Sequence, residues 1–208
     1  MLMAAEELRK LSPKGLQTRQ ALEQAARKLF AERGFHGTTL ADITAAAGKS
    51  SAVFYRYFTD KEDLLAALAE SFLHDVVEPS GLSVHLPDSA ADDTFFTSVV
   101  TGYWNIFKQN IGIMIAVAQL AVTQPRFATV QNEFRRFGMD IVAASVRRAQ
   151  EQGYAGELHP EHTAAAIALL FENFTTVFVG PSDLGVKIDD ADAITTLSRI
   201  WKKTLYGF

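Results

Sequence analysis

The 208-residue chain contains no cysteine. Disulfides, thiolate metal ligands and cysteine nucleophiles are therefore excluded, and the composition suits a reducing compartment. Long hydrophobic runs are also missing: the longest, Ile111 to Ala118, is far shorter than the ~20 residues that cross a membrane. The chain starts MLMAAEELRKL, with charges where an export signal has an apolar segment. We therefore expect a cytoplasmic protein with no membrane partner.

Alternating strand patterns of useful length and internal repeats are absent as well. Apolar residues instead recur at helical spacing through most of the chain, which predicts an all-α fold. The expected helices lie near 16–33, 39–47, 50–57, 60–77, 92–109, 111–122, 125–152 and 160–179, and a last one, capped by Asp189 or Asp190, ends near Tyr206. A frayed N-terminal arm precedes them, and residues 78–91 form a loop.

Catalytic motifs are also lacking: the chain has no glycine-rich phosphate loop, serine elbow or paired-carboxylate motif. His159, Glu161 and His162 lie together at a helix start, but a metal site needs three or four convergent ligands. Helix capping and solvent exposure explain this cluster better than metal binding. We therefore expect no enzyme, no metal and no cofactor.

Residues 38–57 contain the signals of two short helices joined by a tight turn. Thr39 can cap the first helix, with Asp42 reaching back to it. Gly48 can reverse the chain through a positive φ, and Ser50 can cap the second helix. That helix starts with small side chains, which let its backbone approach another surface. This pattern favours a helix-turn-helix that places its second helix in a DNA major groove.

The charge is divided unevenly along the chain. Residues 1–61 carry ten Lys and Arg against six Asp and Glu, a net charge of +4, whereas residues 62–208 have a net charge of −8. A basic front and an acidic body suit a protein that meets phosphates at one end only. The imbalance is modest, so it supports DNA binding only as a secondary observation.

Four segments occur in order between about residues 19 and 65: AARKLFAERGF (25–35), TTLADI (38–43), AAAG (45–48) and FYRYFTDKEDLL (54–65). Together they resemble the DNA-binding domain of the TetR family of bacterial transcription regulators. The resemblance implies a three-helix DNA-binding domain over residues 1–58 and a larger helical ligand-binding and dimerisation domain over 59–208. It also implies a homodimer, formed by the last two helices packing as a four-helix bundle.

The resemblance assigns DNA contacts residue by residue. The positions expected at phosphates or base edges are Thr38 or Thr39, Lys49, Ser50, Ser51, Ala52, Val53, Tyr55, Arg56, Tyr57 and Lys61. Lys49, Ala52 and Val53 depart from the family's usual residues, which affects the operator sequence and not the fold. Ordinary packing is the alternative interpretation of the two tyrosines.

The C-terminal block is rich in aromatic residues, more than one helix seam requires, which indicates an apolar cavity or a subunit interface beside plain core packing. The resemblance implies a ligand cavity between the helices near 92–152 and 160–179. The predicted ligand-binding residues are Tyr103, Trp104, Phe107, Phe134, Phe137, Phe171, Asn173 and Phe174. Glu172 is left open between a polar ligand group, Arg147 or Arg148 of a second subunit, and solvent, because a carboxylate buried alone is costly.

The function that these observations favour is a ligand-responsive, DNA-binding repressor that binds a palindromic operator as a homodimer and is released by an apolar or aromatic effector. Two alternatives stay open. One is an all-helical carrier or enzyme for apolar ligands with a vestigial helix-turn-helix. The other is a dimeric DNA-binding protein without effector control.

Overall fold

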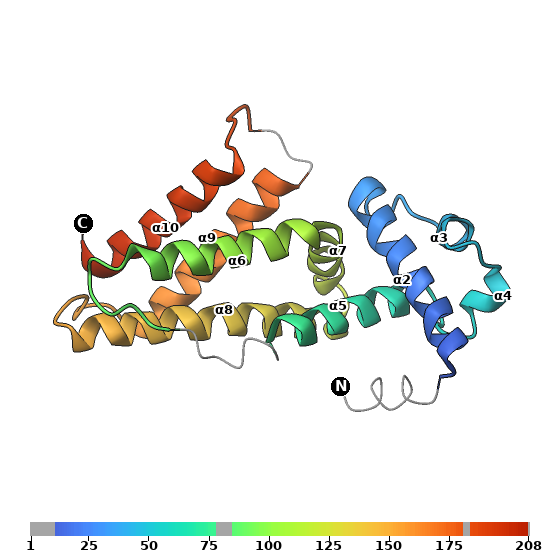
Figure 1. Cartoon of the computed structure of the whole chain (residues 1–208), viewed down its shortest axis with the longest axis horizontal. Coiled ribbons are helices and arrows are strands. Elements are labelled where there is room, and N and C mark those ends of the chain that lie inside the picture. The colour runs from blue at the N-terminus through green and yellow to red at the C-terminus, as the bar shows by residue number, and fades with distance from the viewer. Residues whose placement is uncertain (1–10, 78–84, 181–183, 208) are drawn as a thin grey trace. The chain divides into compact units, whose positions relative to one another are not determined.

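The computed structural model describes residues 11–77, 85–180 and 184–207, and within them all regular structure is helical, which confirms the predicted all-α fold. The helices are α2 (Pro13–Arg33), α3 (Leu40–Ala46), α4 (Ser51–Phe54), α5 (Lys61–Val77), α6 (Asp93–Gln109), α7 (Ile111–Ala121), α8 (Pro125–Glu151), α9 (Pro160–Val179) and α10 (Asp190–Tyr206) (Figure 1). Residues 1–10 of the expected N-terminal arm and residues 78–84 of the loop predicted at 78–91 lie outside the described residues, and residues 85–91 contain no helix, as predicted.

Two helix boundaries differ from the sequence-based predictions. Helix α2 begins at Pro13, not near Leu16, because the Ser12 side chain accepts a hydrogen bond from the Gly15 N–H and proline is favoured in the first turn. Helix α4 ends at Phe54, not near Tyr57. After it, the N–H groups of Arg56 and Tyr57 donate to carbonyls three residues back, which tightens the chain into a turn.

The chain forms two compact units, Met1–Glu78 with Asn110–Gln131 and Pro79–Gln109 with Asn132–Phe208. In the first unit α2 packs against α3, α5 and α7, and α5 also packs against α7. Helix α7 lies so close to α2 that a Cβ at Gly112 would come within 2.7 Å of the Phe30 carbonyl oxygen. The expected helix at 60–77, α5, therefore lies with the helix-turn-helix in one compact unit.

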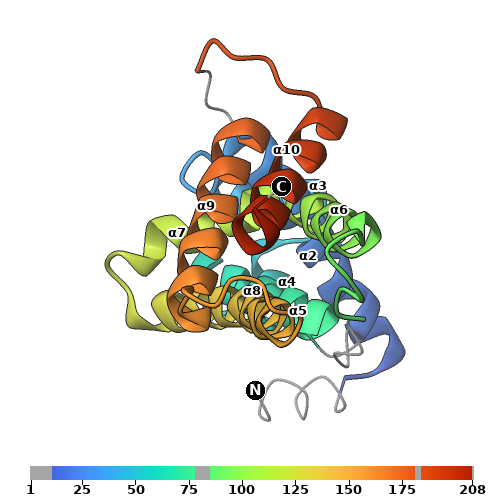
Figure 2. The ribbon, with the colours of Figure 1, turned by 90° about the vertical axis from the view of Figure 1, so that its left-hand side faces the viewer.

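The core of the second unit is built by four helices, α6, α8, α9 and α10 (Figure 2). Trp201 is almost fully buried at its centre, with the rings of Phe95, Phe96 and Phe171 at centroid distances of 5.4, 5.2 and 6.1 Å. The indole N–H of Trp201 donates to Ser145 Oγ at 3.2 Å. This aromatic centre fixes the helices that carry most of the predicted ligand-binding residues.

Candidate functional site

Helix α3 is held at its start by the predicted capping box. Thr39 Oγ1 accepts from the Asp42 N–H at 3.1 Å, and Asp42 Oδ2 accepts from the Thr39 N–H at 2.9 Å. Hydrogen bonds from the Thr39 hydroxyl and backbone hold the pKa of the Asp42 carboxyl below its usual value. Gly48 has a φ of 63°, so it makes the left-handed turn into α4 that a side chain would disfavour.

Helix α4 presents its small and polar residues to solvent. Ser50 caps it, accepting from the Val53 N–H at 3.4 Å, and the ring of Phe54 anchors it, fully buried and 5.5 Å from that of Phe58. On the other side, Tyr55 is 62% exposed. The other predicted contact residues of this segment are exposed at Ser50, Ser51, Ala52 and Arg56 and half-buried at Lys49, Val53 and Tyr57. The segment has the surface that the DNA-contact prediction requires.

Of the two threonines proposed for a phosphate contact, only Thr39 is exposed. The Thr38 side chain has no exposed surface, and its hydroxyl donates to the Gly34 carbonyl oxygen at 2.8 Å. Lys61 also differs from a free cation, because its ammonium donates to the carbonyl oxygens of Phe35 and Thr38. Burial lowers the pKa of Lys61, and the neighbouring Glu62 carboxylate opposes this shift.

Several predicted ligand-binding residues come together in the second unit. The ring of Tyr103 lies 5.6 Å from that of Phe107 and 5.7 Å from that of Phe171, and Trp104 lies 6.3 Å from Phe174. The Trp104 indole N–H donates to Asp190 Oδ1 at 3.0 Å. The remaining predicted residues are Phe134 and Phe137, which are half-buried on α8, and Asn173, which is exposed on α9.

Glu172 finds its partner within the same chain. Its two carboxylate oxygens accept from Nε and Nη2 of Arg135 at 2.7 and 2.8 Å, a bidentate pair between α9 and α8. Arg147 instead pairs with Glu161, and Arg148 with Glu151. Neither arginine is therefore needed to neutralise Glu172, and sequence reasoning missed Arg135 because the partner is 37 residues away.

Two buried hydroxyls beside this ion pair lack hydrogen-bond partners. Among the described residues, the buried side-chain polar atoms without a partner are the Tyr103 hydroxyl and Thr175 Oγ1. Burial raises the pKa of the Tyr103 hydroxyl well above its usual value, and the Glu172 carboxylate adds to the rise. The Thr175 hydroxyl is close enough to lower this pKa, but the two hydroxyls do not meet the geometry of a hydrogen bond. A buried polar group without a partner is unfavourable, so this point in the aromatic cluster can accept a polar group from outside the chain.

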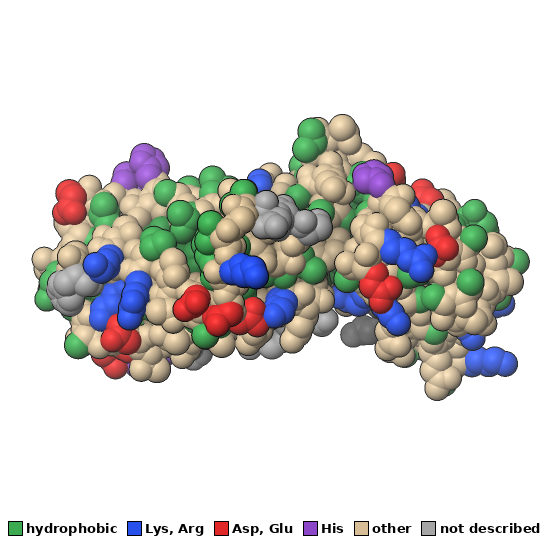
Figure 3. All heavy atoms as spheres, turned by 90° about the horizontal axis from the view of Figure 1, so that it is seen from above, with side chains coloured by type: hydrophobic (Ala, Val, Ile, Leu, Met, Phe, Trp, Pro, Cys, Tyr) green, Lys and Arg blue, Asp and Glu red, His purple; other side chains and the backbone are tan. Residues whose placement is uncertain are grey.

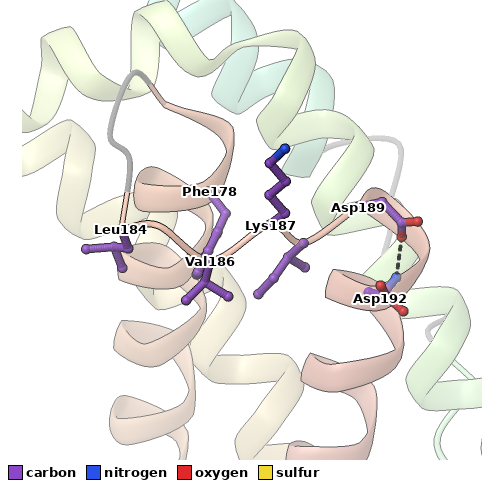
Figure 4. A pocket seen from close by; sticks show the side chains of 7 residues that line it. Phe178, Leu184, Val186, Lys187, Asp189 and Asp192 are labelled. Carbon is purple, nitrogen blue, oxygen red and sulfur yellow. Dashed lines mark hydrogen bonds between the residues drawn. The ribbon is translucent and has the colours of Figure 1, made fainter.

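Two open hollows lie elsewhere in the second unit. One, of about 420 Å³, has Phe178, Leu184 and Val186 on one side and Asp189 and Asp192 on the other (Figure 4). A second, of about 560 Å³, is lined by residues of the segment from His85 to Asp92 and of the first part of α6. None of the predicted ligand-binding residues lines either hollow.

Helix α9 exposes an apolar stripe. Ala166, Leu169 and Leu170 are exposed at helical spacing, the two leucines by 50% and 41%, and the polar Asn173 follows on the same face. Hydrophobic side chains also reach the surface of the part of the molecule that carries α9 and α10 (Figure 3). Helix α9 is long and apolar enough by composition to cross a membrane, with 22% of its most apolar window buried. In the sequence, Glu172 and Asn173 interrupt the apolar residues of this helix, so it contains no long uninterrupted apolar run.

His159 and His162 do not converge on a common point. Their rings stack face to face at 3.9 Å, and His159 Nδ1 lies 3.2 Å from Glu161 Oε2. Among the described residues no group of three or more histidine and carboxylate side chains could hold a metal ion. The cluster therefore offers no arrangement suited to metal binding in the described part of the chain.

The capped α3, the Gly48 turn and the exposed surface of α4 define a helix-turn-helix DNA-binding protein. Residues 23–68 match the family model described as "Bacterial regulatory proteins, tetR family". This match, the curated relatives and the solved structures together support assignment of the chain to the TetR family of bacterial transcriptional regulators. The protein is a transcriptional regulator and not an enzyme. Its curated relatives are likewise named as transcriptional regulators or repressors.

The relatives extend the similarity beyond the helix-turn-helix. The chain is 26% identical to the HTH-type transcriptional regulator EthR of Mycobacterium tuberculosis, over 94% of this chain and 90% of that one. It is 32% identical to the repressor KstR2 of Rhodococcus jostii, over 62% and 65%. Among solved structures, FadR of Bacillus subtilis in complex with stearoyl-CoA superposes with a TM-score of 0.66 at 18% identity, covering 91% of this chain and 98% of that one.

Proposed function

We propose that this regulator is a homodimeric repressor that binds a palindromic operator and leaves it when an apolar or aromatic effector binds. The observation that carries the proposal is the surface of α4: small Ser51 and Ala52 and the exposed Tyr55 and Arg56 follow a capped start. Small side chains allow close approach to base edges, and tyrosine and arginine can contact phosphates. A regulator of this kind acts in the cytoplasm, where the DNA lies.

The apolar stripe of α9 supports the homodimer. Exposed Leu169 and Leu170, together with Ile200 on α10, which is 39% exposed, are the kind of surface that a second copy covers in a two-fold interface. Burial of this α9 surface against a second copy would also account for its apolar composition, with no membrane involved. Two copies would place two α4 helices about one turn of DNA apart, ~34 Å.

The unpaired hydroxyls of Tyr103 and Thr175 support an effector that enters the aromatic cluster of the second unit. Rings of Phe107 and Phe171 beside Tyr103 favour a flat or apolar ligand. A carbonyl or similar acceptor on that ligand would satisfy the buried donors. The stearoyl-CoA complex of the structural neighbour FadR is an example of an apolar ligand on this fold.

Selection of bound fragments from random duplexes, followed by mobility shift with the selected duplex, tests the proposal. The expected sequence is an inverted repeat, bound by two copies of the chain, with an affinity that falls steeply with salt. Sedimentation of the free protein checks the dimer independently. A strictly monomeric protein that retains no duplex at low salt would exclude the proposed function.

A further inference from the structure

Lys61 is the first residue of α5, and its ammonium group is held by backbone carbonyls of the turn between α2 and α3. Nζ donates to the carbonyl oxygens of Phe35 at 2.6 Å and of Thr38 at 2.7 Å, and it lies 4.2 Å from the centroid of the Phe35 ring. Both carbonyls belong to the turn between the end of α2 at Arg33 and the start of α3 at Leu40. Lys61 thus ties the first turn of α5 to the residues that begin the helix-turn-helix.

The turn that Lys61 binds is itself rigidly built. The Phe35 side chain is 3% exposed, and its ring lies 5.3 Å from that of Phe30 on α2. The buried Thr38 hydroxyl donates back to the Gly34 and Leu29 carbonyls. A hydrogen bond from a charged donor is stronger than one between neutral groups, so the ammonium adds a strong tie between two ordered elements.

The neighbouring residue Glu62 binds on another side of the same helical turn. Its Oε2 accepts from Gln124 Nε2 at 2.9 Å and from Arg126 Nη2 at 3.4 Å. Gln124 and Arg126 flank the start of α8, and they belong to the same compact unit as α5. The first turn of α5 is therefore connected to the α2–α3 turn through Lys61 and to the α7–α8 turn through Glu62.

We propose that Lys61 is a positioning residue that fixes the helix-turn-helix relative to α5, and not a phosphate ligand. The inference rests on the proposed function and deepens it, because it names the contact through which displacement of α5 reaches α3 and α4. A phosphate ligand must direct its N–H groups at DNA, whereas two of the three N–H donors of Lys61 already bind Phe35 and Thr38. Displacement of α5 in response to an effector would pull on these two carbonyls and tilt α3, and α4 with it.

Lys61→Met tests the proposal, with Lys49→Met as the matched control that removes one cation from the same domain. Operator binding is measured by mobility shift across a salt series. A lost phosphate contact makes the slope of log K against log salt shallower by about 0.9 per contact, which we expect for Lys49→Met. For Lys61→Met we expect about tenfold weaker binding at every salt concentration with the wild-type slope, as for a lost charged hydrogen bond.

Amide hydrogen exchange of the free protein tests the same contact without DNA. We expect Lys61→Met, and not Lys49→Met, to speed exchange in α3, including at Ile43, whose N–H bonds the Thr39 carbonyl. The exchange experiment shows whether Lys61 fixes α3 even if the protein binds no duplex. A negative result in this experiment can therefore be told apart from a failure of the proposed function. Unchanged exchange in α3, or a slope reduced as much as in Lys49→Met, would overturn the proposal.

Lys61→Arg covers the case in which Lys61→Met does not fold. Arginine keeps the charge and is a strong phosphate ligand, but its planar fork is not a substitute for an ammonium seated between two carbonyls. We expect weaker operator binding and faster exchange in α3 with an unchanged salt slope. Wild-type binding together with wild-type exchange in Lys61→Arg would contradict the positioning role.

Discussion

The backbone of Gly112 lies directly against the carbonyl group of Phe30. A methyl group at position 112 would come 2.6 Å from the Phe30 carbonyl carbon and 2.7 Å from its oxygen. Only glycine allows α7 to approach α2 this closely. The contact joins α7 to the helix that supports the helix-turn-helix, and it is reinforced by the hydrogen bond from Arg27 Nη1 to Asn110 Oδ1 at 2.8 Å.

Gly112→Ala is therefore expected to lower the free energy of unfolding by about 1–3 kcal/mol, because the backbone must shift to admit the methyl group. Gly102→Ala is the matched control: it also lies in a helix, but nothing approaches its would-be Cβ within 4 Å. That change should be neutral or stabilise by up to about 1 kcal/mol. Urea unfolding of both variants measures the difference, and equal stabilities would contradict the close approach.

Tyr103→Phe should leave the free energy of unfolding unchanged or raise it, within about 1 kcal/mol, since it removes a buried hydroxyl that has no partner. Tyr206→Phe is the control, because the Tyr206 hydroxyl donates to Gln152 Oε1 at 2.9 Å. Its removal should cost about 1 kcal/mol. If urea unfolding shows that Tyr103→Phe is the more damaging of the two, its hydroxyl is bonded within the chain.

Tyr55→Phe should weaken binding to the selected operator and to an unrelated duplex by a similar factor, about three- to tenfold. The reason is that a phosphate contact positions the protein without reading sequence. Tyr154→Phe, in the second compact unit, should bind as the wild type does. Mobility shifts with both duplexes measure the effect, and an unchanged affinity of Tyr55→Phe would remove this residue from the interface.

Acid should weaken the hydrogen bonds that Trp104 and Lys108 of α6 donate to the Asp190 carboxylate of α10. Hydrogen bonds from Lys108 and then Trp104 hold the pKa of the Asp190 carboxyl below its usual value of 3.8. Because the folded pKa is the lower one, the stabilisation is complete above the unfolded pKa and is lost as the pH falls through the folded pKa, below about pH 4.

We therefore expect Asp190→Asn to be less stable than the wild type at pH 7 and to lose less stability on acidification. Asp140→Asn, which changes an exposed carboxylate on α8, is the control and should keep the wild-type dependence. Urea midpoints between about pH 2 and 7 measure both. Parallel pH profiles for the wild type and Asp190→Asn would show that the carboxylate does not stabilise the fold.

Features that depend on residues close together in the chain, such as helix caps and turns, could be predicted from the sequence. The caps at Thr39 and Ser50 and the turn at Gly48 are local, and the structure confirms each of them. Of the two residues predicted for the cap of the last helix, Asp189 or Asp190, the structure places Asp189 there. The start of α2 was misplaced although it is also local. The prediction near 16–33 leaves out Pro13, although proline suits the first turn of a helix.

Contacts between distant residues could not be predicted from one sequence. Lys61 was assigned to phosphate, but its carbonyl partners lie 23 and 26 residues earlier, and Glu62 meets a partner 62 residues later. Thr38 and Thr39 are adjacent and chemically identical, yet packing buries one and exposes the other. The aromatic residues identify the core of the second unit, but their number alone does not separate core packing from a ligand site. The individual DNA and effector contacts therefore remain predictions.

Helix α4, the proposed reading helix, has only four residues, Ser51–Phe54, which leaves room for very few base-specific hydrogen bonds. Each mismatched base pair in a site costs on the order of 1–3 kcal/mol, so one subunit can reject only a small set of wrong sequences. Groove width and the bending stiffness of the intervening base pairs must then carry part of the selectivity. We therefore expect the operators of the proposed dimer to resemble one another in the shape of the central base pairs, which the protein does not contact, as closely as in the base sequence of the two half-sites.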